Sequence, residues 1–278
     1  MRVYLYLLFL PLFFTNCSTN TTDMADKEIK VLYLHHSTGY GVWRGDVNRY
    51  VFRLTKKGAV QKYLEKYDKK HGVNYSIQHQ AFPKTEPYGW KNYPYDYYNI
   101  WVKHAGDQSY MEEPTLEMLT KQYDVIVFKH CFPVSSIKAD EDTADINSEV
   151  KTLANYKLQY KALKEKLHQF PKTKFIVWTG AALTEANSDI ESAKRAEEFA
   201  NWVKGTWNED GDNIFLWDFR ELEVEGGLYL KEDYASGPTN SHPNRQFNEK
   251  AAGLFVNRLA DIIENNGKNT DLLGNPLK

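Results

Sequence analysis

The stretch IKVLYLH at Ile29–His35, followed directly by HSTG at 36–39, decides the fold of this chain. A short apolar run is typical of a strand that is buried on both faces, as the strands of parallel sheets are. The stretches 123–128, 173–178 and 213–218 have the same character, and 73–80 alternates polar and apolar residues as a strand does. The sequence therefore predicts five strands.

Segments with apolar residues at helical spacing separate or follow these strands. They lie at 60–70, 114–121, 153–170, 186–207 and 246–265. Strands that alternate with helices in this way form a parallel sheet that helices cover on both faces. We therefore expect one α/β domain over 28–268, followed by a C-terminal tail at 269–278.

The composition of the chain excludes several classes of protein. Lys and Arg number 35 against 37 Asp and Glu, and this net charge of −2 offers no basic surface for nucleic acid. Aromatic residues make up 14% of the chain, which argues against a disordered protein. The one long apolar run lies at the N-terminus, so the sequence does not describe a multi-span membrane protein.

Residues 1–16 have the pattern of an export signal. Arg2 supplies a positive charge, the apolar run 3–14 is short for a membrane span, and Cys17 opens a polar tract. A cysteine at this place resembles the lipid-modified cysteine of bacterial lipoproteins; an ordinary signal peptide that is cut elsewhere is the alternative. We expect lipidation at Cys17, a tether at 17–27, and an exported protein anchored to a bacterial membrane, facing the periplasm or the cell surface.

Two polar residues fall where such folds bind ligands, outside the carboxyl ends of the strands. Ser37 follows the first strand, and a serine there can attack a bound carbonyl while its own N–H helps to hold the oxyanion. His242 lies just before the last helix and could act as the general base at the same edge. Each also has a purely structural explanation, since Ser37 could cap a turn and His242 could lie on the surface.

Together these residues resemble the SGNH (GDSL-type) esterases and acetylhydrolases. That family's opening block, a strand and then Gly-Asp-Ser, corresponds to 34–37 here, and its last block, Asp-x-x-His-Pro, corresponds to 239–243. The resemblance covers the mature chain in element order. It implies a three-layer α/β/α sandwich with a five-stranded, mainly parallel sheet (SGNH- or flavodoxin-like), with Ser37 as nucleophile, His242 as base and no cofactor.

The chain departs from this family at three places. Two histidines replace the Gly-Asp before Ser37, and Thr239 replaces the acid that orients the catalytic histidine, so Asp218, Asp233 or a main-chain carbonyl would have to serve. The Gly-x-Asn-Asp block is also absent, and 129–136 takes its place. We therefore expect an oxyanion hole of three groups, Ser37, Gly106 and His130, with Gly89 as the alternative glycine and Ser135 or Ser136 as alternative donors.

Cysteine or metal chemistry at this edge is the competing interpretation. Adjacent residues of a strand point to opposite faces, so His130 and Cys131 should not act together, and a buried, inert thiol is favoured. His35, His36 and His242 would lie near them, but no spacing here matches a metal motif. We expect no metal site, and we expect one of His35 and His36 to face the core.

The segment 83–101 is the most unusual in composition. Seven tyrosines and tryptophans are interleaved there with Pro, Gly, Asn and Lys. A long loop inside a compact domain is usually functional. Aromatic faces with nearby amides suit sugar rings, which makes Trp90, Tyr93 and Trp101 candidate substrate-binding residues; the alternative is that these rings only pack the loop onto the sheet.

These features lead to one functional hypothesis and one alternative. The hypothesis is a carboxylic ester hydrolase of SGNH type that removes O-acyl groups, with acetyl expected, from a carbohydrate through Ser37 and His242. The alternative is a non-catalytic, glycan-binding lipoprotein with a degenerate form of the fold. Under the hypothesis the partner is an acylated carbohydrate, without nucleic acid, and with a membrane only through the lipid anchor.

Overall fold

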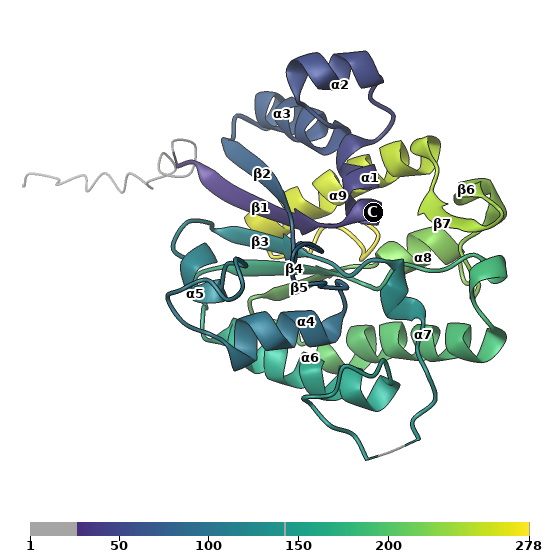
Figure 1. The fold of residues 1–278 in the computed structure, drawn as a ribbon. Helices are drawn as coiled ribbons and strands as arrows, with labels where there is room; N and C mark the ends of the chain where they lie inside the picture. Colours follow the sequence, from purple (N-terminus) through teal and green to yellow (C-terminus); the bar gives the residue numbers. More distant parts are fainter. Residues whose placement is uncertain (1–26, 142, 278) are drawn as a thin grey trace, which may run out of the picture.

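The computed structural model describes residues 27–141 and 143–277, and it has three layers (Figure 1). The expected signal segment 1–16, the lipidation site Cys17 and the tether up to residue 26 lie outside the described residues. Within the described part of the chain, no helix is both long and apolar enough to cross a membrane.

The middle layer is the predicted parallel sheet of five strands. Its order is β2 (Tyr75–Ala81), β1 (Ile29–His35), β3 (Val125–Phe128), β4 (Lys174–Trp178) and β5 (Ile214–Trp217). Alternate residues of β1 pack against opposite helical layers, since Tyr33 belongs to one core and Leu34 to the other. Burying each such large apolar side chain contributes about 1.5–3 kcal/mol, which explains why the central strands are apolar throughout.

Helices cover both faces of this sheet. One layer contains α1 (Ser37–Arg44), α3 (Ala59–His71), α8 (Phe219–Val224) and α9 (Arg245–Asn265). The other contains α4 (Pro94–Tyr97), the π-helix η1 (Tyr98–Lys103), α6 (Leu153–His168), α7 (Ile190–Trp202) and the π-turn η4 (Val203–Trp207). The predicted fold class, a three-layer α/β/α sandwich, is confirmed.

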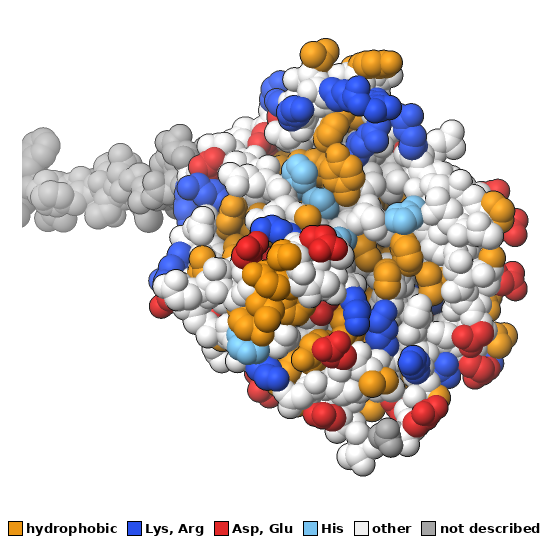
Figure 2. All heavy atoms as spheres, viewed as in Figure 1, with side chains coloured by type: hydrophobic (Ala, Val, Ile, Leu, Met, Phe, Trp, Pro, Cys, Tyr) orange, Lys and Arg blue, Asp and Glu red, His pale blue; other side chains and the backbone are white. Residues whose placement is uncertain are grey.

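Shorter elements complete the chain. They are α2 (Arg49–Thr55), α5 (Leu116–Leu119), the 3₁₀ turns η2 (Phe132–Ser135), η3 (Glu185–Asn187) and η5 (Glu232–Tyr234), and the hairpin of β6 (Ala235–Gly237) and β7 (Asn240–Pro243). Helix α2 lies at the top of the molecule in Figure 1 and buries none of its own residues; its Tyr50 and Leu54 are 72% and 86% exposed. Figure 2 shows hydrophobic side chains at the surface in this part of the molecule.

Three sequence-based boundaries need correction. The helix expected at 186–207 begins only at Ile190, because the Asp189 carboxylate caps it by accepting a hydrogen bond from Ser192 N at 2.8 Å. The helix expected at 114–121 is the single turn α5. The loop expected at 83–101 ends in a helix, α4, whose first residue is Pro94, a position that tolerates proline because its N–H would have no partner there.

The expected C-terminal tail is also wrong, because residues 269–277 pack onto the sheet. Asp218 N donates to Leu272 O at 2.8 Å, and the Trp217 indole donates to Leu273 O at 3.0 Å. Thr270 is only 8% exposed. The domain therefore includes this segment.

Candidate active site

Ser37 is the first residue of α1, directly beyond the carboxyl end of β1, and it is exposed. The sequence did not predict this helix, which contains two glycines. Gly39 allows α1 to lie close to the sheet, because a Cβ there would be 2.6 Å from Lys129 Cδ and 2.7 Å from His35 Cβ. The free N–H groups and the positive end of the helix dipole therefore lie at the ligand-binding edge.

A pocket of about 360 Å³ opens at Ser37. Its walls include His36, Asn92, Cys131 and Phe132, which follow the carboxyl ends of β1, β2 and β3. This volume lies within the range typical of small-molecule sites. The predicted place of the site, at the carboxyl edge of the sheet, is where this pocket lies.

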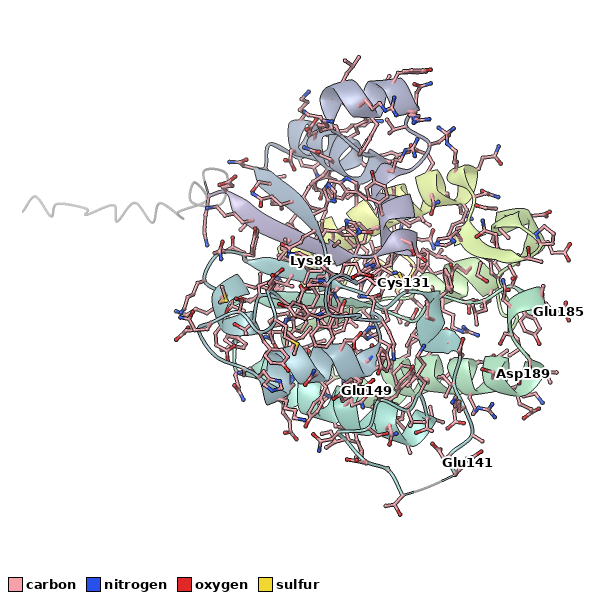
Figure 3. The ribbon with its side chains drawn as sticks, viewed as in Figure 1. Lys84, Cys131, Glu141, Glu149, Glu185 and Asp189 are labelled. Carbon is pink, nitrogen blue, oxygen red and sulfur yellow. The ribbon has the colours of Figure 1, made fainter. Side chains whose placement is uncertain are left out.

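The hydroxyl of Ser37 contacts a thiol rather than a histidine. Ser37 Oγ lies 3.5 Å from Cys131 Sγ, and Lys129, which is 1% exposed, donates to the same sulfur at 3.3 Å. Figure 3 places Cys131 near the middle of the molecule, among the ends of the strands. The three side chains form one cluster, of which Ser37 and Cys131 line the pocket.

This cluster favours the thiolate form of Cys131. Burial raises the pKa of the Cys131 thiol, but the charge of Lys129 and hydrogen bonds from Ser37 and the Thr38 N–H outweigh burial, so the pKa lies below its usual value. A nearby cation and a helix N-terminus are the surroundings of reactive cysteines. Cys131 is buried as predicted, but its surroundings are not those of an inert thiol.

Replacing Lys129 with methionine is therefore expected to slow the alkylation of Cys131 at pH 7. Loss of the cation raises the pKa of the thiol, and each unit lowers the thiolate fraction about tenfold. The measurement is the rate of iodoacetamide labelling against pH, with peptides resolved by mass spectrometry. Lys151→Met, which changes a pocket lysine that donates to Pro133 O rather than to the sulfur, is the matched control. Equal rates in all three proteins would show that Lys129 does not activate the thiol.

His242 lies on β7, and the hairpin is held in place by its neighbours. Ser241, which is 3% exposed, accepts a hydrogen bond from Thr184 N at 3.0 Å and fixes the strand. Asn240 Oδ1 accepts the main-chain N–H of His242 at 3.1 Å and lies 2.9 Å from its Nδ1. Because an amide oxygen only accepts, Nδ1 carries the proton and Nε2 keeps its lone pair. Among the described residues, Asn240, and neither Asp218 nor Asp233, is therefore the side chain that orients the His242 ring.

The structure brings His242 to the pocket region without a hydrogen bond to Ser37. Its ring packs edge-on against Phe132, with centroids 4.9 Å apart, and Phe132 also lines the pocket. Among residues 27–141 and 143–277, Cys131 is the side chain that contacts Ser37 Oγ.

Two of the three expected oxyanion groups lie elsewhere. His130 is fully buried and packs edge-on against Tyr97 at 4.6 Å, on the sheet face opposite Cys131, as the alternation of a strand requires. Gly106 accepts a hydrogen bond from Thr115, just before α5 and far from the carboxyl edge. His130 and Gly106 therefore cannot hold an oxyanion at Ser37, and those two predictions are wrong.

The aromatic segment is divided between core and pocket. Trp101 is fully buried, with its indole donating to Pro114 O at 3.1 Å, so its predicted substrate-binding role is wrong. Tyr93 is 1% exposed but contributes to a second cavity, and Trp90, at 8%, lines both that cavity and the Ser37 pocket. The packing interpretation therefore holds for Trp101, while Trp90 and Tyr93 remain candidates.

His35 and His36, the remaining histidines at this edge, point in different directions because neighbouring residues of an extended chain alternate between the two faces of the sheet. His35 faces the core at 5% exposed and pairs with His79, their ring nitrogens 2.8 Å apart, whereas His36 lines the pocket and contacts Pro83 O. The prediction that one of the two faces the core is confirmed. In the described segments, no three His, Cys, Asp or Glu side chains gather in a way that could hold a metal ion.

Sequence reasoning missed Asn92, which joins the ends of two strands below the pocket. Its Oδ1 accepts from Cys131 N at 2.6 Å, and its Nδ2 donates to Phe82 O at 2.9 Å. The backbone of Asn92 has a φ of 57°, a left-handed conformation that asparagine tolerates better than most residues. The sequence offered only this tolerance of asparagine for a left-handed backbone, which does not by itself indicate a functional site.

No protein-family model matches this sequence, and no curated protein matches it. One similar solved structure is a carbohydrate esterase whose active site displays divergent catalytic and non-catalytic binding functions, at 14% identity and a TM-score of 0.36, covering 84% of this chain and 65% of that one. Another is a family two carbohydrate esterase from Cellvibrio japonicus, at 12% identity and a TM-score of 0.40, covering 85% and 62%. This chain spans less than two thirds of either structure.

Proposed function

We propose that this protein is a serine esterase that removes O-acyl groups, acetyl first among them, from a carbohydrate. The observation that carries the proposal is the position of Ser37, exposed at the start of α1 and in the wall of the pocket. His242, with Nε2 free to accept a proton, is held at the same edge by Asn240. The proposal includes export and lipid anchoring at Cys17, which rest on the N-terminal sequence alone.

The proposed reaction proceeds through a covalent acyl-enzyme. Ser37 Oγ attacks the ester carbonyl carbon, and its proton passes to His242 Nε2. The protonated His242 then gives this proton to the departing sugar oxygen as the carbon–oxygen bond breaks. Water, deprotonated by His242, attacks the acyl-enzyme and releases the acid, which restores both side chains.

The first turn of α1 supplies the electrostatic support for this reaction. In this proposal, the N–H of Ser37 and the positive end of the α1 dipole stabilise the negative charge that develops on the carbonyl oxygen. Oxyanion donors of this kind contribute about 10²–10³ in kcat each when they are preorganised.

Cys131 favours a second candidate, a thiol nucleophile in the same pocket. Its sulfur receives hydrogen bonds from Lys129 and the Ser37 hydroxyl, which favours the thiolate. In this case a thioester at Cys131 would replace the ester at Ser37. The adjoining Ser37 hydroxyl would then act as a hydrogen-bond donor.

Covalent labelling separates the two candidates. A fluorophosphonate probe, which reacts with activated serine hydroxyls, is expected to modify the peptide that contains Ser37 in the native protein and not after heat denaturation. Labelling at Cys131 alone, or no labelling at Ser37, would overturn the serine mechanism. Lack of any probe reaction together with lack of acetate release would favour the non-catalytic, glycan-binding alternative.

The pH dependence of kcat/KM should follow the protonation of His242. Burial and the nearby charge of Lys129 lower the pKa of His242 below its usual value. The neutral imidazole is the base, so activity rises with pH through this lowered pKa, and the midpoint of the profile lies below the value of about 6.5 at which unperturbed histidine titrates. A midpoint well above that value in the pH profile of acetate release would mean that another group is the base.

A further inference from the structure

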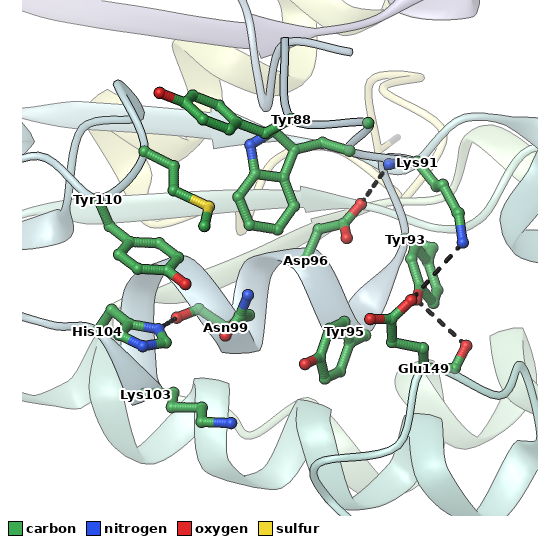
Figure 4. Close-up of a pocket in the computed structure, with 13 residues that line it drawn as sticks. Tyr88, Lys91, Tyr93, Tyr95, Asp96, Asn99, Lys103, His104, Tyr110 and Glu149 are labelled. Carbon is green, nitrogen blue, oxygen red and sulfur yellow. Dashed lines mark hydrogen bonds and ion pairs between the residues drawn. The ribbon is translucent and has the colours of Figure 1, made fainter. Parts of the chain in front are cut away.

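A second cavity, which we call the tyrosine pocket, adjoins the Ser37 pocket. It has a volume of about 610 Å³, and its walls include Tyr88, Tyr95 and Tyr110 (Figure 4). Trp90 and Lys91 line both cavities, so the two cavities are neighbours that share this part of their walls. A ligand that is held at Ser37 and passes these two residues reaches the tyrosine pocket.

Tyr88, Tyr95 and Tyr110 of the tyrosine pocket are not fully buried, so their rings and hydroxyls are accessible to a ligand. Tyr88 is 44% exposed, and Tyr95 and Tyr110 are partly exposed. Tyr110 stacks on His104 with ring centroids 3.7 Å apart and an interplanar angle of 4°, which fixes the tyrosine ring in the wall. Fixed aromatic rings offer an apolar surface at low entropic cost, with a hydroxyl for hydrogen bonding.

Asn99 adds an amide to the wall of this cavity. The residue is 8% exposed and lines the cavity. Its main-chain oxygen accepts a hydrogen bond from His104 Nδ1 at 2.9 Å, but its side-chain amide makes no hydrogen bond within the described residues (Figure 4). The amide atoms are not among the buried side-chain atoms of the described residues that lack a partner, so solvent reaches them and a ligand in the cavity can pair with them.

Both acidic and basic side chains line this cavity. Lys91 Nζ lies 3.7 Å from the Glu149 carboxylate, and Lys103 lies at the opposite end of the pocket in Figure 4. Asp96 accepts from Lys91 N at 2.7 Å, and burial raises its pKa to about 7 despite hydrogen bonds from three main-chain N–H groups. Neither a strongly anionic nor a strongly cationic ligand is favoured by this mixture. A neutral ligand that both donates and accepts hydrogen bonds fits it best.

We propose that the tyrosine pocket binds a neutral sugar unit next to the acylated one, so that the substrate is an oligosaccharide or polysaccharide rather than an acylated monosaccharide. This inference rests on the proposed function, because it assumes that the acylated sugar of the same oligosaccharide occupies the Ser37 pocket. The tyrosine faces pack against the sugar ring, and Asn99 and the hydroxyls of Tyr95 and Tyr110 pair with its hydroxyl groups.

Binding measured without turnover tests this proposal. In the full chain carrying Ser37→Ala, calorimetry with acetylated xylo- and manno-oligosaccharides of one to six units is expected to give at least tenfold tighter binding for the longer members, since each hydrogen bond gained to a buried group is worth up to about that factor. Adding Asn99→Ala or Tyr95→Ala should weaken binding of the longer members about tenfold and leave the single unit unaffected. Tyr50→Ala, an exposed tyrosine on α2, is the matched control.

The outcomes separate this inference from the proposed function. If no member binds, if one unit binds as tightly as six, or if both tyrosine-pocket variants bind like the control, the inference is overturned, whatever the esterase assays give. If the longer members bind through Asn99 and Tyr95 but the protein with Ser37 restored releases no acetate, the esterase proposal fails and the sugar site stands. Circular dichroism and thermal melting of both variants exclude misfolding as the cause of weaker binding.

Discussion

Replacing Ser37 with alanine is expected to lower kcat/KM for acetate release from an acetylated oligosaccharide by at least about 10³-fold, because the nucleophile is lost. His242→Ala should cost a similar factor. The double variant should be no worse than either single variant, since a nucleophile and its base act as a unit. Asn240→Ala, which removes only the oxygen that orients the imidazole, should cost less than His242→Ala.

The control for this series is another serine of the same sheet. Ser76 lies on the edge strand β2, near its amino end and away from the pocket, so Ser76→Ala should keep wild-type kinetics. Activity that survives Ser37→Ala but not Cys131→Ala would assign catalysis to the thiol. Activity that survives both Ser37→Ala and Cys131→Ala would show that neither side chain of this pocket is the nucleophile.

The sequence predicted the sheet well because its strands are defined by local composition. β3, β4 and β5 are short apolar runs between polar segments. Strands that are buried on both faces require apolar side chains at nearly every position, so such runs identify them. The helix α1 was missed because it is only eight residues long and contains a serine, a threonine and two glycines, which have low helix propensity. Its helical form depends on packing against α9 and on the close approach at Gly39, which are contacts between distant parts of the chain.

The site was predicted at the level of topology but not of side-chain contacts. The carboxyl edge of a parallel sheet fixes where Ser37 lies, and the hairpin before α9 brings His242 to the same region. Whether Ser37 meets His242 or Cys131 depends on side-chain direction at the ends of three elements. The aromatic segment shows the same limit, since Trp101 in the core and Tyr88 in a pocket wall come from one stretch of similar composition.

The buried lysine is the clearest case of information that the sequence lacks. Lysine is almost never fully buried without a partner, and the sequence indicated no role for Lys129 beyond its place at the start of the segment 129–136. In the structure it lies under α1 at 1% exposed, with the Cys131 sulfur as its hydrogen-bond acceptor. Because the sequence did not predict α1, it could not show that Lys129 is buried beneath this helix.

The C-terminal segment leads to the largest expected effect on stability. Arg258 of α9 is 5% exposed, and its guanidinium donates to Leu216 O on β5 at 3.1 Å and to Gly267 O at 2.7 Å. It also donates to Thr270 Oγ1 at 3.0 Å and lies 3.8 Å from the Asp261 carboxylate. This one side chain therefore connects the sheet, the last helix and the segment that follows it.

Replacing Arg258 with methionine is expected to lower the free energy of unfolding by about 3–5 kcal/mol, the cost of removing one member of a buried charged network. Methionine fills a similar length but leaves the acceptors on Leu216, Gly267 and Thr270 without the guanidinium donor. It also removes the positive charge beside the buried Asp261 carboxylate. Urea unfolding measures the change, with Arg245→Met as the control on the same helix. Arg245 pairs with Asp46 at 2.8 Å, but both side chains are more than half exposed, at 59% and 53%, so that substitution should cost about 1 kcal/mol or less. Equal costs at the two positions would mean that residues 269–277 contribute little to the folded domain and behave as the tail that the sequence predicted.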